Sequence, residues 1–193
     1  MKKVVVIAGP SGSGKNTVIR QLLERYPRAA KLVTATTRVK RPSEEEGVDY
    51  FFFDINRFDS EESQGHIQGK RFVNLFGGIH YGIYTPDLDQ KLQSASVVFA
   101  PVDITGAEWL KQNYGATTIF IMPESLEEYR IRIRARDPEM TDREFEERVK
   151  MTDHELHVDS SRFDYRIINT GGMLTHTVDE VVEILQKEGY SLA

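Results

Sequence analysis

A glycine-rich segment directly follows the first apolar run of the chain: Gly9, Pro10, Ser11, Gly12, Ser13, Gly14 and Lys15. The spacing G-x-x-x-x-G-K is typical of a loop whose backbone N–H groups point at phosphate oxygens, because glycines let the backbone turn tightly. A helix expected to begin near Asn16 adds the positive end of its dipole. Lys15 supplies a cation for the β- and γ-phosphates, so the segment predicts a site for the phosphates of ATP.

A magnesium ligand is expected directly after this lysine, where such loops carry a hydroxyl. Asn16 stands there instead, and Thr17 follows. The Thr17 hydroxyl can serve Mg²⁺ directly or through water, and the Asn16 amide can accept from a metal-bound water. We therefore expect ATP to bind with Mg²⁺, with both residues in the ATP site and Thr17 as the metal ligand.

A second cluster of positive charge comprises Arg38, Lys40 and Arg41. Paired guanidinium groups suit a phosphate dianion because each offers forked donors. Tyr50 and Tyr81 can add hydroxyl hydrogen bonds to the same phosphate. For this run taken alone, a solvated basic loop is the alternative interpretation.

A third group of arginines lies on two expected helices. Arg132 and Arg136 are four residues apart and share a helix face, and Arg148 lies on the following helix. Phosphoryl transfer needs mainly positioning and positive charge, which these residues can supply. Surface pairing with nearby glutamates is the alternative, and we favour it for Arg130, Arg134 and Arg143.

Several segments together resemble the guanylate kinase family, nearly from end to end: T-T-R-x-x-R at 36–41, G-x-D-Y at 47–50, Tyr81-Gly82, residues 102–107, and residues 163–169. In that family two arginines and two tyrosines hold the phosphate of GMP, and lid arginines close over ATP. The resemblance implies phosphoryl transfer from ATP to a nucleoside monophosphate, GMP first, with Lys15, Arg38, Arg132, Arg136 and Arg148 as catalytic residues. It also implies that Asn169 lies near the adenine and that the acceptor site contains Thr34, Arg38, Arg41, Tyr50, Asn74, Tyr81 and Asp103.

The positions that read guanine in the family differ here. A gapped alignment places Asn74, and an ungapped one Phe72, where the family has a glutamate. Ile83 replaces a hydroxyl residue, unless Thr85 substitutes for it, and Pro101 replaces an aspartate. The acceptor can thus be GMP, another nucleoside monophosphate or a phosphorylated sugar. A non-catalytic binding module is the rival from another class, although a pure scaffold has no need of a phosphate loop.

The order of apolar runs and helical patterns predicts an α/β P-loop kinase fold, with helices on both faces of a five-stranded parallel sheet. The expected strands are residues 4–8, 32–36, 97–102, 117–122 and 166–168. Ser125 with Glu128 and Thr141 with Glu144 predict capping boxes for two helices.

The middle of the chain breaks this rhythm. Short aromatic runs at 50–53, 71–76 and 79–84 indicate antiparallel strands. We expect one domain with a core of residues 1–36 and 93–193, a helical lid at about 126–150, and an inserted small antiparallel β-rich subdomain, 37–92, that binds the acceptor.

Composition limits the function classes. The 193 residues include no cysteine and carry a net charge of −5, so disulfides, cysteine metal sites and a global basic field for nucleic acid are excluded. No apolar stretch approaches the length that spans a bilayer. We expect a cytoplasmic monomer or homodimer that binds neither nucleic acid nor membrane. Surface positions are expected for His154, His157 and the acidic run Glu44, Glu45 and Glu46.

Overall fold

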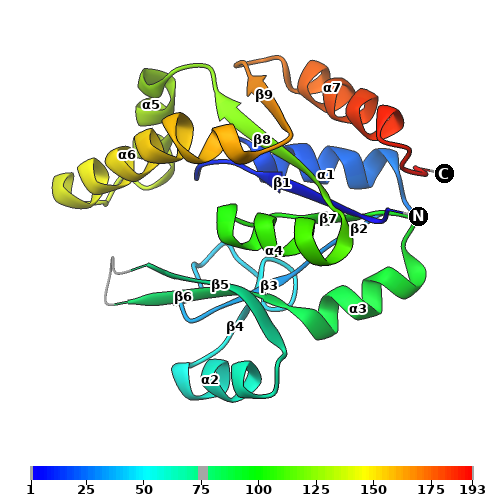
Figure 1. Ribbon diagram of the computed structural model, residues 1–193. Helices are drawn as coiled ribbons and strands as arrows, with labels where there is room; N and C mark the ends of the chain where they lie inside the picture. The colour runs from blue at the N-terminus through cyan, green and yellow to red at the C-terminus, as the bar shows by residue number, and fades with distance from the viewer. Residues whose placement is uncertain (1, 74–77, 193) are drawn as a thin grey trace.

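The computed structural model describes residues 2–73 and 78–192 (Figure 1). Its larger sheet has the order β2-β7-β1-β8-β9, and every neighbouring pair is parallel. The strands are β1 (Val4–Ala8), β2 (Ala30–Lys31), β7 (Val98–Ala100), β8 (Thr117–Pro123) and β9 (Tyr165–Asn169). All of β1 is buried, as expected for a central parallel strand covered on both faces. The expected five-stranded parallel sheet is confirmed.

Two helical layers cover the sheet. On one face, α1 (Lys15–Arg25) and α7 (Leu174–Lys187) pack against alternate residues of β1, among them Val5 and Ile7. On the other face, α3 (Thr85–Ser94) and α4 (Ile104–Tyr114) pack against Val4 and Val6. The two cores explain why β1 is apolar throughout, without alternation.

A second, four-stranded sheet has the order β4-β3-β6-β5 and lies beside α2 (Ile55–Ser63) (Figure 1). Its strands are β3 (Thr34–Thr36), β4 (Tyr50–Phe52), β5 (Ile67–Val73) and β6 (Ile79–Tyr84). The β3–β6 and β5–β6 pairs are antiparallel, but β3 and β4 are parallel. The expected antiparallel subdomain is therefore a mixed sheet with a helix, and β5 begins before residue 71.

The single strand predicted at 32–36 is also wrong, because the chain changes sheets within it. Leu32 N–H still donates to Phe99 O of the parallel sheet at 2.8 Å. Val33 N–H donates instead to the buried carboxylate of Asp87 at 2.9 Å, and Thr34 begins β3 of the mixed sheet. A side-chain acceptor distant in sequence thus ends the pairing with β7, which no local pattern reveals.

The helices α5 (Leu126–Arg136) and α6 (Asp142–His157) form a pair with a small core of their own: Tyr129, Ile133, Phe145 and Val149. A short 3₁₀ helix, η1 (Asp159–Arg162), follows. The capping box of Thr141 and Glu144 is confirmed. Ser125 accepts from Glu128 N–H, but the Glu128 carboxylate accepts from Arg132, so only half of the first predicted box forms.

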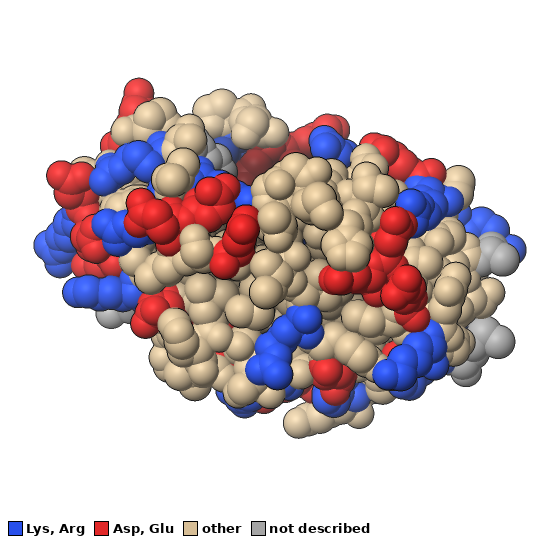
Figure 2. Space-filling model, turned by 90° about the horizontal axis from the view of Figure 1, so that it is seen from above, with Lys and Arg blue, Asp and Glu red and all other residues tan. Residues whose placement is uncertain are grey.

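On the face seen in Figure 2, groups of acidic and basic side chains are interspersed around a broad area of other residues. Among the described residues, no helix is both long and apolar enough to cross a membrane.

Candidate functional site

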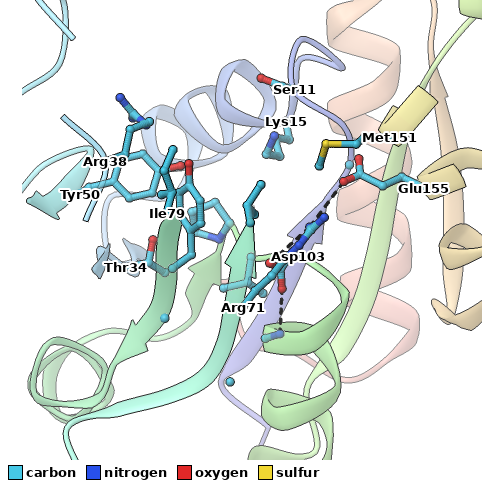
Figure 3. Close-up of a pocket in the computed structure, with 18 of the residues that line it drawn as sticks. Ser11, Lys15, Thr34, Arg38, Tyr50, Arg71, Ile79, Asp103, Met151 and Glu155 are labelled. Carbon is cyan, nitrogen blue, oxygen red and sulfur yellow. Dashed lines mark hydrogen bonds and ion pairs between the residues drawn. The ribbon is translucent and has the colours of Figure 1, made fainter. Parts of the chain in front are cut away.

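A cavity of about 260 Å³ opens at the carboxyl ends of the parallel strands, between the mixed sheet and α6 (Figure 3). Parallel α/β sheets commonly bind ligands at this edge. The cavity brings together ten of the predicted site residues, from segments far apart in the chain: Gly9, Ser11, Lys15, Thr34, Arg38, Arg41, Tyr50, Tyr81, Asp103 and Arg148. The phosphate loop and the Arg38–Arg41 cluster therefore face one space.

The phosphate loop connects β1 to α1 and requires glycine where it turns. Gly9 has φ +144°, and a Cβ there would lie 2.3 Å from Ile121 O. Gly14 has φ +92°, and a Cβ there would lie 2.2 Å from Asn169 Nδ2. Both positions combine left-handed backbone with close packing, which only glycine allows. The predicted strand–loop–helix arrangement is present, with α1 beginning at Lys15.

Asn169 supports this loop from behind. Its Nδ2 donates to Ser13 O at 2.8 Å, and its Oδ1 accepts from Thr177 Oγ1 at 3.2 Å, both in buried surroundings. Both polar atoms of the Asn169 side-chain amide are thus engaged, and the bond from Nδ2 holds the phosphate loop in place. Of the other predicted ATP-site residues, Pro10 O lies 3.3 Å from Lys15 Nζ, and Gly12 and Ser13 complete the turn. Asn16 is exposed and Thr17 is half-buried in the first turn of α1.

Arg38 is held in place by aromatic rings and a carboxylate. Its guanidinium carbon lies 5.5 Å from the Tyr50 ring centroid and 5.7 Å from that of Phe52. Its Nη2 donates to Glu44 Oε1 at 2.7 Å, and Arg41 N–H donates to Glu44 Oε2 at 2.8 Å. The Glu44 side chain is only 13% exposed, so its expected place on the loop surface is wrong. It fixes both arginines on one loop.

The surroundings of Glu44 and Tyr50 shift the pKa values of both side chains. Burial opposes ionisation of Glu44, but the hydrogen bonds from Arg38 and from Arg41 N–H outweigh it and hold the pKa of Glu44 below its usual value. Burial, together with the neighbouring Tyr81, raises the pKa of Tyr50 to about 12. The Tyr50 hydroxyl therefore stays protonated and can donate to an anionic ligand.

The helix α6 presents Arg148, Met151, Thr152 and Glu155 to the cavity, at the spacing of one helix face. Arg148 Nη1 and Arg41 Nη2 each lie 3.9 Å from Asp137 Oδ2, so α6 and the acceptor loop approach the same carboxylate.

Of the arginines predicted on α5, Arg132 is not among the described residues that line the cavity. Arg132 Nε donates to Glu128 at 2.9 Å, and Arg136 is the last residue of the helix. Arg130, Arg134 and Arg143 form ion pairs with neighbouring acidic residues, as we favoured.

Sequence reasoning missed two charged residues of the cavity, Arg71 on β5 and Glu155 on α6. Arg71 Nη1 lies 3.5 Å from both Asp103 Oδ2 and Glu155 Oε1 (Figure 3). Burial raises the pKa of Glu155, against the opposing charges of Arg71 and Lys15. The spacing of Glu155, seven residues after Arg148, was a signal that both share a face.

The remaining predictions concern the positions expected to read the base. Thr34, Ile83 and Pro101 line the cavity, whereas Thr85 Oγ1 donates to His66 O and Phe72 is 55% exposed. Asn74 lies outside the described residues. Within residues 2–73 and 78–192, no group of three or more His, Asp or Glu side chains is arranged to hold a metal ion.

Comparisons with known proteins identify the family of this chain. A family model described as "Guanylate kinase" matches residues 1–188. The guanylate kinase of Prochlorococcus marinus is 32% identical over 190 residues, 97% of this chain and 96% of that protein. The guanylate kinase of Trichormus variabilis is 33% identical over 168 residues, covering 86% and 82% of the two chains.

Solved structures are similar as well. The guanylate kinase from Anaplasma phagocytophilum has a TM-score of 0.73 at 27% identity, over 98% of this chain and 88% of that one. Shikimate kinase from Acinetobacter baumannii shares the fold, with a TM-score of 0.54 at 13% identity over 99% and 97% of the two chains.

Proposed function

This chain belongs to the guanylate kinase family of nucleoside monophosphate kinases, and we propose that it transfers the γ-phosphoryl group of ATP to GMP, giving ADP and GDP. One observation carries the proposal. The phosphate loop with Lys15 and the loop with Arg38 and Arg41 line the same cavity. Two phosphate-binding elements on one cavity suit a reaction between two phosphorylated molecules.

Phosphoryl transfer requires the protein mainly to position the two substrates and to supply positive charge. An oxygen of the acceptor phosphate forms a bond to the γ-phosphorus of ATP, while the bond from that phosphorus to the β–γ bridging oxygen breaks and ADP leaves. The attacking phosphate oxygen is already anionic, so no general base is required. Cations at the phosphates lower the barrier by stabilising charge as it moves between oxygens.

Each cation has a distinct proposed role. Lys15 binds the β- and γ-phosphates of ATP from the loop. Arg38 and Arg41 hold the acceptor phosphate, with hydroxyl donors from Tyr50 and Tyr81, whose ring centroids are 6.2 Å apart. Arg148 lies on the α6 side of the cavity and neutralises charge on the transferring group. Arg132 and Arg136 are proposed to act on ATP from α5.

Magnesium is part of the proposal. Mg²⁺ prefers oxygen ligands, keeps several waters and is commonly held by substrate phosphates with one or two protein groups. The Thr17 hydroxyl, in the first turn after the phosphate loop, is an oxygen donor of the kind that fits. When bound, the ion would neutralise phosphate charge beside Lys15.

Closure of the cavity is proposed as well. We assign residues 1–36 and 93–193 to a core, residues 126–150 to a lid and residues 37–92 to an acceptor subdomain. Lid and acceptor subdomain already approach each other at Asp137, which lies 3.9 Å from Arg41 and from Arg148. Such parts commonly close on substrate and exclude water.

The test is ADP release measured by a coupled assay with ATP, Mg²⁺ and a panel of acceptors: GMP, AMP, CMP, UMP and ribose 5-phosphate. We expect ADP release that depends on a nucleoside monophosphate and is highest with GMP. Release with ribose 5-phosphate alone, or none with any acceptor, would contradict the proposal.

A further inference from the structure

The mixed sheet presents apolar side chains to the cavity beside Tyr50 and Tyr81, together with a few polar groups. Val73, Ile79 and Ile83 line the cavity, and Ile83 is fully buried. An apolar slot of this kind suits the faces of a nucleobase. The edge of the base must then be read by polar groups that line the same cavity, among them Thr34, Arg71, Asp103 and Glu155.

Arg71 faces the cavity because of the strand register. It pairs with Tyr81 across β5 and β6, and the pairing shifts between Gln68 and Arg71 at a bulge. Its two neighbours point the other way: Lys70 pairs with Glu62, and Phe72 packs on His80. Figure 3 shows Arg71 between Asp103 and Glu155, across the cavity from Arg38.

The guanidinium of Arg71 keeps donors for a ligand. From the described part of the chain, both of its ion pairs reach Nη1, and at 3.5 Å they are at the outer limit of a hydrogen bond. A guanidinium has five N–H donors in a planar fork. Nε and Nη2 can therefore pair with two acceptors on one ligand edge.

The carboxylates of Asp103 and Glu155 are less available to a ligand than the Arg71 guanidinium. Asp103 Oδ1 accepts from Gly106 N–H at 3.1 Å as the N-cap of α4, and its Oδ2 faces Arg71. Glu155 Oε1 also faces Arg71. A carboxylate that reads guanine must accept from N1–H and the amine together. Neither group has both oxygens free for that pairing.

We propose that Arg71 is the specificity-determining residue for the acceptor base, reading O6 and N7 of a 6-oxopurine; this rests on the proposed function. Arginine pairs bidentately with O6 and N7 of guanine. Hypoxanthine carries the same two acceptors, so IMP is accepted like GMP. Adenine places an amine donor where O6 would be and faces the guanidinium with a donor. Pyrimidines offer at most one acceptor on the corresponding edge.

The wild-type protein provides the first test. Catalytic efficiency is measured with GMP, IMP, AMP and 7-deaza-GMP, which lacks the N7 acceptor. GMP and IMP should agree within about threefold, and 7-deaza-GMP and AMP should fall by about 5- to 150-fold, the discrimination of one bidentate pair. Efficient GMP turnover that IMP does not share and 7-deaza-GMP does not impair would overturn this inference alone. No turnover with GMP or IMP would overturn the proposed function together with it.

Variants sharpen the test. Arg71→Gln should lower the GMP-to-AMP efficiency ratio by about tenfold or more, because a glutamine amide matches N6 and N7 of adenine. Arg71→Lys keeps the charge beside Glu155 but loses the fork, so the GMP-to-AMP ratio should fall with the KM for ATP unchanged. Lys70→Gln, on the opposite face of the same strand, is the matched control. A GMP-to-AMP efficiency ratio that is the same in Arg71→Lys as in the wild type would overturn the assignment.

Discussion

The parts of the cavity to which we assign the phosphates and the acceptor base are built in different ways. At the phosphate end, a backbone turn and the cluster around Arg38 each come from one short stretch of sequence. At the base end, Thr34, Arg71, Ile83 and Asp103 come from β3, β5, β6 and the start of α4. In the proposed function, phosphate binding is therefore a local property of the chain, whereas base reading depends on how four elements are aligned. The register shift in β5 between Gln68 and Arg71 affects which side chains of this strand face the cavity.

The largest expected effect is at the phosphate loop. Lys15→Ala should lower turnover by about 100-fold or more, a typical loss for one preorganised charge at a transferring group. The exposed Lys150→Ala on α6 is the control and should keep full turnover. Circular dichroism and thermal unfolding check that both variants fold. Near-normal turnover of folded Lys15→Ala would remove the phosphate loop from the mechanism.

The arginines of the acceptor loop should affect one substrate and not the other. Arg38→Ala and Arg41→Ala should each weaken GMP binding by about 1.5–3 kcal/mol, the range for charged hydrogen bonds. ATP affinity should barely change. Titration calorimetry of each variant with GMP and with an ATP analogue tests this. Equal weakening for both ligands would mean that the cluster serves the donor.

Arg148 is expected to act on the transfer step. Arg148→Ala should lower kcat by about tenfold or more, since a charge-assisted contact contributes about 1.5 kcal/mol at the lower end of its range. The KM for GMP should change little. Arg143→Ala on the same helix, 88% exposed and paired with Glu147, is the control. A rise in the KM for GMP with kcat unchanged would place Arg148 at the acceptor instead.

A smaller, pH-dependent effect is expected from Glu44. Its pKa is lower in the folded protein than the ordinary value of 4.5, so its stabilising contribution is complete above that pH and is lost as the pH falls through the folded pKa. Glu44→Gln should therefore cost about 1–3 kcal/mol of unfolding free energy at pH 7 and progressively less below pH 4.5.

Urea unfolding of wild type and Glu44→Gln across this pH range measures the difference. Glu45→Gln, at an exposed neighbour, is the control. A difference that stays constant down to pH 3 would show that folding does not lower the pKa of Glu44.

The sequence allowed most of the parallel core to be predicted, because each buried strand and amphipathic helix carries its own pattern. Residues 4–8 and the apolar face of α7 are examples. The crossing between sheets at Val33 could not be predicted, since it depends on Asp87, 54 residues away. The parallel pairing of β4 with β3 is likewise a matter of partner choice, which strand composition does not specify.

For the candidate site, too, features with a local sequence pattern could be predicted, and features that depend on distant contacts could not. The loop at Lys15 and the pair Arg38 and Arg41 were identified by spacing, and the structure brings them to one cavity. Glu44 was misplaced on the surface because a run of three glutamates normally indicates solvation. Arg71 was overlooked because alternation along β5 is interrupted by the bulge, which decides the side of the sheet that its side chain occupies.

The central claim is that the phosphoryl group lost by ATP is transferred to GMP. Its most direct test is incubation of the protein with ATP, GMP and Mg²⁺, followed by chromatographic quantification of all four nucleotides over time. We predict ADP and GDP in equal amounts, at matching rates, with no ADP formed when GMP is omitted. ADP released without an equal amount of GDP would contradict the account.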